Sequence, residues 1–268
     1  MTRTVSSAFT AIVLCLTTAV PASSQDSQSN DWELINTNRG NTVAAAAQFD
    51  NGITLIARCQ NRQAFDLLIG GLPDSSAKRR TLQVGVGENS RMRNVEWLSG
   101  ADRKSAFSLY PMSLARDLMR GGTIRIRVPG QNGAPSTLYV METEPSVTAI
   151  AETLTACDKP LVDPRDARET EMLEELPADI EWARRPMPSP DAIGNAATHL
   201  ETYVVVSCLT AEGGALKDCR IESANPFNER INRIVLDASR NGRLRLKESG
   251  EAPLPDREIS YAVPIFIS

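Results

Sequence analysis

Apolar and polar residues alternate through most of the first half of the chain. Segments 42–49 and 53–59 are predicted strands, and between them lies Asp-Asn-Gly, a strong signal for a hairpin turn. Every second residue of a strand lies on the same face, so the apolar residues of segment 53–59, Cys59 included, should point to one core. The pattern therefore predicts a β-hairpin with a buried cysteine at the end of its second strand.

The same period of two recurs after this hairpin and predicts a β-rich domain over residues 31–158. Two helical patterns interrupt it, at residues 113–120 and 146–156, and the second ends at Cys157. We expect this last helix to close the domain against the sheet. Further strands are predicted at residues 32–35, 64–69, 81–86, 94–97, 106–110, 123–128 and 138–141.

Residues 203–226 have the pattern of two strands joined by a tight turn. The pair Gly213-Gly214 supplies the positive φ angles that a two-residue turn needs. Folding the chain about that pair places Thr210 opposite Lys217 and Cys208 opposite Cys219, within disulfide distance. The alternative is two separate buried thiols.

The rest of the second half predicts a small domain over residues 182–268. A short helix is expected at residues 191–197, and Asn228 can cap a second helix that ends at Asn241-Gly242. Residues 258–267 alternate as a final strand that contains Pro264. We predict two helices packed on a three-stranded antiparallel sheet, and residues 159–181 form an acidic, proline-rich linker to it. The fold class is then α+β with two domains, which suits a length of 268 residues.

The N-terminus reads as a secretory signal over residues 1–22. One charge, Arg3, precedes an apolar run from Ala8 to Val20, and Val20 and Ala22 fit a cleavage site. Because the run is short for a membrane span, we expect cleavage and a mature chain without a span. Residues 23–30 would form a disordered leader. An uncleaved anchor is the alternative.

Charge and cysteine content then narrow the function classes. The net charge of −4, without a concentrated basic face, argues against nucleic acid as a partner. Removal of the signal leaves Cys59, Cys157, Cys208 and Cys219, an even number in an exported chain, which suggests disulfides. The hairpin argument pairs Cys208 with Cys219 and leaves Cys59 for Cys157.

We find no pattern for catalysis, a metal or a cofactor. The one histidine, His199, precedes a strand and has no acidic or cysteine partners at catalytic spacing. The cysteines do not form C-x-x-C, and the glycine pairs are not part of a phosphate loop. The alternative is an enzyme whose site assembles from scattered Asp, Glu, Ser and Tyr residues of the first domain.

The order of features from residue 182 onward resembles the C-terminal domain of TonB, the periplasmic energy transducer. That order is strand, turn glycines, strand, the sequence Ser-Ala-Asn-Pro, a helix and an alternating closing strand. The resemblance implies that an extended segment of an outer-membrane receptor adds to a sheet edge. The edge would be the final strand, with candidate partner-binding residues Ile259, Tyr261, Val263, Ile265 and Ile267.

The chain departs from a TonB transducer in ways that change the expected role. Its apolar N-terminal run has no histidine, its linker is short, and a folded domain precedes the TonB-like one. We therefore expect a non-enzymatic periplasmic binding or scaffold protein that engages an envelope protein. The alternative is an energy transducer of outer-membrane transport, held in the inner membrane by an uncleaved anchor. The first domain resembles exported proteins of the invasion-associated locus B type, which also pair an early strand cysteine with a late helix cysteine.

Overall fold

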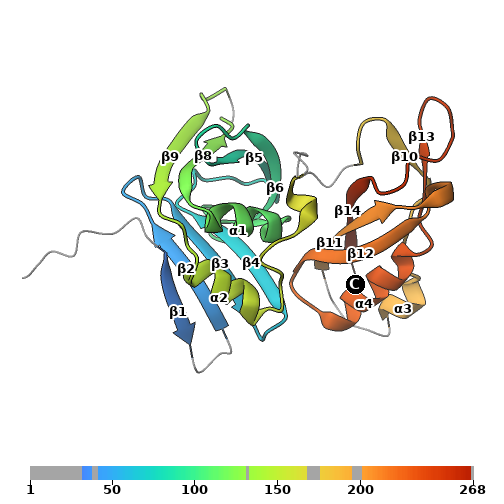
Figure 1. Cartoon of the computed structure of the whole chain (residues 1–268), viewed down its shortest axis with the longest axis horizontal. Coiled ribbons are helices and arrows are strands. Elements are labelled where there is room, and N and C mark those ends of the chain that lie inside the picture. The colour runs from blue at the N-terminus through green and yellow to red at the C-terminus, as the bar shows by residue number, and fades with distance from the viewer. Residues whose placement is uncertain (1–31, 38–41, 131–132, 168–175, 195–200, 267–268) are drawn as a thin grey trace, which may run out of the picture.

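The computed structural model describes residues 32–37, 42–130, 133–167, 176–194 and 201–266. Within these ranges the first half is an antiparallel sheet of nine strands in the order β1-β2-β3-β4-β7-β6-β5-β8-β9 (Figure 1). The strands are β1 Glu33–Thr37, β2 Thr42–Gln48, β3 Thr54–Gln60, β4 Ala64–Gly70, β5 Arg79–Val86, β6 Arg93–Ser99, β7 Ala106–Ser108, β8 Gly122–Val128 and β9 Thr137–Thr143.

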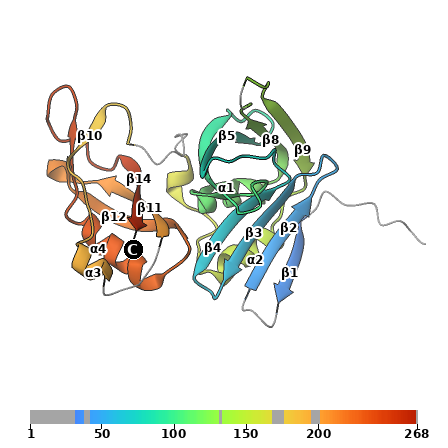
Figure 2. The same ribbon diagram turned by 180° about the vertical axis from the view of Figure 1, so that it is seen from behind.

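Two helices cover this sheet together. Helix α1, Pro111–Met119, packs against β4, and α2, Ala149–Ala156, packs against β2 and β3 and beside α1 (Figures 1 and 2). Side chains of β3 alternate between buried and half-buried, and Cys59 is buried as the pattern predicted. Alternation works here because one face of the sheet packs on the helices.

The second half contains two small sheets. One has three strands in the order β12-β11-β14, with β11 Glu201–Thr210, β12 Leu216–Asn225 and β14 Glu258–Phe266. The other pairs β10, Ile180–Arg184, with β13, Arg243–Leu246. The helical elements after α2 are η1 Pro164–Ala167, α3 Pro190–Gly194, η2 Glu212–Gly214 and α4 Glu229–Ser239.

The expected α+β fold class is wrong, because the chain is mainly β-sheet. A nine-stranded antiparallel sheet dominates the described residues, and α1 and α2 cover it jointly, so no single C-terminal helix closes the first half. The predicted arrangement of the second half, two helices packed on a three-stranded sheet, is wrong as well. Helix α3 has five residues and buries none of them, and Ile180 of β10 and Leu244 of β13 enter the core instead.

The predicted register of the β11–β12 hairpin is correct at Val206–Ile221 and Ser207–Arg220 but wrong next to the turn. Thr210 pairs with Leu216, one residue from the predicted Lys217, because η2 makes the connection longer than a two-residue turn. A Cβ on Gly214 would lie 2.1 Å from the carbonyl oxygen of Leu244. The second glycine is therefore required where β13 passes close to the turn, as well as for its positive φ.

The three-stranded sheet is buried on both faces, and this joins the two halves. Val204 and Val206 of β11 lie in the core beneath α4, whereas Val205 lies in the core of the first half. On β14, Ala262 also joins the first core. Figures 1 and 2 both show β11 and β12 beside the first half. An uninterrupted apolar run such as Val204–Val206 is the pattern of a strand buried on both sides.

Candidate functional site

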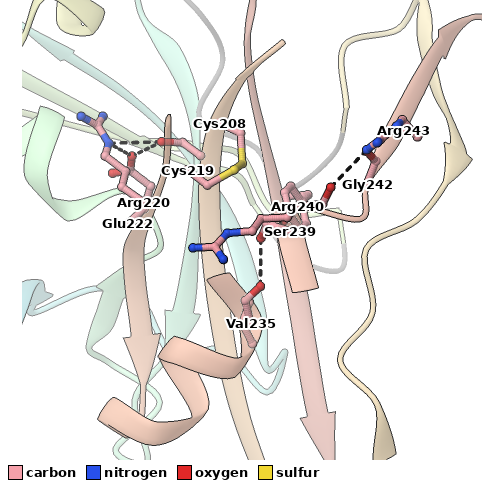
Figure 3. Close-up of a disulfide and its surroundings, with 11 residues drawn as sticks. Cys208, Cys219, Arg220, Glu222, Val235, Ser239, Arg240, Gly242 and Arg243 are labelled. Atoms are coloured by element: carbon pink, nitrogen blue, oxygen red, sulfur yellow. Dashed lines mark hydrogen bonds and ion pairs between the residues drawn. A yellow bond between two sulfur atoms is a disulfide. The ribbon is translucent and has the colours of Figure 1, made fainter. Parts of the chain in front are cut away.

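The two disulfides join the pairs that the sequence analysis named. Cys59 of β3 is bonded to Cys157 at the end of α2, and Cys208 of β11 to Cys219 of β12. The second pair forms despite the altered register, because the β11–β12 ladder shifts between Ser207 and Leu209. Figure 3 shows this bond, with Arg220 and Glu222 farther along β12. Disulfides are typical of a compartment outside the cytoplasm.

A cleft of about 720 Å³ lies between the two halves. One wall consists of β12 and α4, and the other of the β3–β4 turn, α1 and the segment that follows α2. The volume falls in the range of small-molecule sites, which is about 300–1,000 Å³. Both disulfides contribute a cysteine to its lining, Cys157 and Cys219, so each wall is covalently fastened to the sheet behind it.

A network of ion pairs connects the walls. Arg116 of α1 is 1% exposed and binds Asp166 of η1 through two nitrogens. Asp163 binds Arg220 of β12 and lies 3.5 Å from Arg165. Burial raises the pKa of the Asp163 carboxyl, but the Arg165 backbone N–H and the Arg220 guanidinium lower it more, so it lies below the usual value of 3.8.

Further hydrogen bonds hold the halves together beside these ion pairs. Ser223 Oγ donates to the Leu109 carbonyl at 2.8 Å, and Arg79 Nη1 donates to the Tyr203 hydroxyl at 2.9 Å. Burial, and the nearby Glu222 carboxylate, raise the pKa of Tyr110 far above its usual value, although its hydroxyl also bonds Ser260. These contacts, with the shared core, join the first half to all three strands of the small sheet.

Several polar groups of the cleft have no partner. The Asn232 side chain is 7% exposed, and its Oδ1 has no hydrogen-bond donor. Arg165 Nη1 is buried without an acceptor. Lys159 lines the cleft, and its ammonium forms no ion pair or hydrogen bond with any described residue. Burial lowers the pKa of Lys159 below 10.5; the Glu222 carboxylate opposes this lowering, and Arg220 adds to it. No sequence pattern marked these three residues, because they come from distant segments.

The predicted partner-binding strand is an edge of the three-stranded sheet. Among the described residues β14 pairs with β11 alone, in an unbroken register from Glu201–Phe266 to Leu209–Glu258. Its predicted residues Ile259, Tyr261, Val263 and Ile265 have buried side chains in the core beneath α4, so only the backbone edge is available to a partner. Ile267 and His199 lie outside the described residues, as do the signal and leader.

Arg185 limits the backbone edge of β14. Its Nη2 donates to the Ala262 carbonyl at 3.2 Å. Pro264 is opposite Tyr203, and a proline fits an antiparallel ladder where its nitrogen faces away from the paired strand. The backbone N–H and C=O groups of successive residues point to opposite sides of a strand. Residues 262 and 264 are two positions apart, so their backbone groups point to the same side. Both observations indicate that these groups lie on the outer edge.

Comparisons with known proteins give little beyond this geometry. No family model and no curated protein matches the chain. A solution NMR structure of the C-terminal domain of TonB from Pseudomonas aeruginosa is similar to part of it. The identity is 20%, the match covers 34% of this chain and 88% of that one, and the TM-score is 0.26. That score is too low to establish a common fold, so the resemblance to TonB stays a prediction from the sequence.

Neither a membrane-spanning helix nor a metal cluster is found among the described residues. Within those ranges no helix is long and apolar enough to cross a membrane. No group of three or more His, Cys, Asp and Glu residues there is placed to hold a metal ion.

Proposed function

We propose that this chain is an exported, non-enzymatic binding or scaffold protein that engages an extended segment of an envelope protein at the outer edge of β14. The observation that carries the proposal is that β14 pairs with β11 alone among the described residues. An open edge presents backbone N–H and C=O groups that an added strand can satisfy. The two disulfides support a location outside the cytoplasm, and the periplasm is the proposed compartment.

The edge offers fewer hydrogen bonds than an ideal one. Pro264 has no N–H to donate, and the Ala262 carbonyl already accepts from Arg185. Each missing bond costs an added strand about 0.5–1.5 kcal/mol net. Partner affinity is therefore modest, and Arg185 must move for the strand to extend along the whole of β14.

The test is an NMR titration of the full exported chain with extended segments from outer-membrane receptor N-termini. Signals of residues 258–266 should shift more than those of the β11–β12 hairpin. In strand addition every second amide of the peptide bonds to β14 and the others face away. N-methylation of the amides that face β14 should abolish binding, and N-methylation of the other amides should leave the affinity unchanged. Equal effects of the two sets, or shifts confined to the first half, would exclude strand addition at β14.

A further inference from the structure

We infer that the cleft between the halves binds a carboxylate that lies next to an amide N–H and an apolar side chain, the chemistry found at the C-terminus of a peptide. This site is separate from the β14 edge, because β12 and β14 are the opposite edges of the three-stranded sheet. Such a group also occurs in small N-acylated amino acids, and the experiment below distinguishes the two sources.

The preference for an anion follows from the charges that line the cleft. Six cationic and four anionic side chains line it. Arg116, Arg220 and Arg233 are paired with carboxylates, whereas Lys159 and Arg62 form no ion pair with a described residue. A half-buried ammonium has lost part of its hydration, and its lowered pKa reflects that loss. A bound carboxylate would restore a partner to Lys159.

The amide N–H follows from Asn232. An acceptor that is buried without a donor is costly, and native proteins seldom leave one unpaired. Asn232 Oδ1 is such an acceptor, on the α4 wall of the cleft. Arg165 Nη1 is an unpaired donor in the same lining. A ligand that both donates and accepts hydrogen bonds matches this pair of groups, and an anion such as sulfate or chloride supplies no donor.

The apolar side chain follows from the remaining surface. Phe65 and Met112 come from the first half and Phe227 and Leu236 from the second, so both walls offer apolar contacts to the same ligand. Binding sites of this size are typically apolar with a few placed polar groups. Two aromatic rings in the lining favour an aromatic or large aliphatic side chain.

The experiment measures the affinity of two probes by calorimetry with the full exported chain. The probes are N-acetyl-phenylalanine and an acetylated hexapeptide that ends in phenylalanine, each as the free acid and as the C-terminal amide. We expect the acids to bind about tenfold or more tightly than the amides, because a hydrogen bond to a charged group is worth at least that factor. A tighter hexapeptide identifies a peptide terminus as the ligand, and equal affinities identify a small acid.

Three variants test the assigned groups. Lys159→Met should lower the affinity for the acids about tenfold and leave the affinity for the amides unchanged. Lys104 is an exposed lysine outside the cleft, and Lys104→Met should change neither affinity. Asn232→Leu should lower the affinity for all four probes, because it removes the Oδ1 that would accept from the amide N–H they share. In the unaltered chain, the backbone signals of residues 159, 165 and 232 should shift with the acids. Acids that bind no better than amides, or equal effects of the Lys159 and Lys104 changes, would overturn the inference.

Discussion

Strands β12 and β14 are the two edges of one three-stranded sheet, yet they face different surroundings. The first half packs beside β12 through the Asp163–Arg220 ion pair and the Ser223–Leu109 hydrogen bond, which leaves a charged cleft. Beside β14, Arg185 donates a hydrogen bond to one outer carbonyl, that of Ala262. The two edges thus differ mainly because of what is packed next to them.

The difference also separates two kinds of binding site. At β12 the surrounding side chains are fixed by disulfides and ion pairs, which favours a small ligand of defined shape. At β14 only a backbone edge is offered, which favours an extended segment of variable sequence. Changes near β12 should therefore alter stability and ligand binding together, and changes near β14 should alter partner binding with little effect on stability.

The largest effect should follow loss of the Cys59–Cys157 disulfide, which joins residues 98 positions apart. The chain-entropy model gives about 4.7 kcal/mol for a loop of that length, as an upper value. Replacement of both cysteines by serine should lower the free energy of unfolding by about 2–5 kcal/mol in urea titrations. The replacement should also lower the affinity of the cleft for the acid probes, because the disulfide fixes the wall that carries Lys159.

Loss of the shorter disulfide is the matched comparison. Cys208 and Cys219 are 11 positions apart, for which the same model gives about 2.5–3 kcal/mol. A larger loss of stability from this pair than from Cys59–Cys157 would contradict the entropic account.

The next effect concerns the buried ion pair between Arg116 and Asp166. Asp166→Ala leaves an arginine that is 1% exposed without its main carboxylate and should cost about 3 kcal/mol of unfolding free energy. The measurement is a urea unfolding curve. Asp237→Ala removes an exposed ion pair with Arg240 and should cost less than about 0.5 kcal/mol. Equal costs would mean that η1 is not held against α1.

A smaller, pH-dependent effect is expected at Asp163. The pKa of Asp163 is lowered in the folded chain. The charged carboxylate therefore stabilises the fold above the usual carboxyl pKa, and this stabilisation is lost as the pH falls through the lowered pKa. Asp163→Asn should therefore be less stable than the unaltered chain by about 1.5–3 kcal/mol at neutral pH. The gap should narrow below pH ~4. Thermal unfolding at several pH values measures it, and a gap that widens on acidification would give the wrong sign.

The smallest effect belongs to the β14 edge. Arg185→Ala removes the hydrogen bond to the Ala262 carbonyl and should cost about 0.5–1.5 kcal/mol of stability. By freeing that carbonyl it should tighten binding of an added strand. Arg184→Ala, an exposed neighbour that bonds the Asn241 carbonyl, is the control and should leave partner affinity unchanged. Weaker partner binding by the Arg185 variant would place the docking edge elsewhere.

The sequence by itself determined the local features. Alternation located most of the strands and the buried face that carries Cys59, and the cap at Asn228 marked the start of α4, where its side chain accepts from the Ile231 N–H. These features depend on side-chain periods and on neighbouring residues, which the sequence displays directly. The cysteine pairs also followed from spacing within a hairpin and from the remaining count.

Only the tertiary structure decided the fold class, the β11–β12 register and the cleft. Strands that look separate in the sequence join one nine-stranded sheet, and β10 and β13 meet across more than fifty intervening residues, so no local pattern revealed either pairing. Lys159, Arg165 and Asn232 line one cleft because β12 docks on the first half. The run Val204–Val206 indicates burial on both faces, but what packs on each face depends on contacts between distant segments.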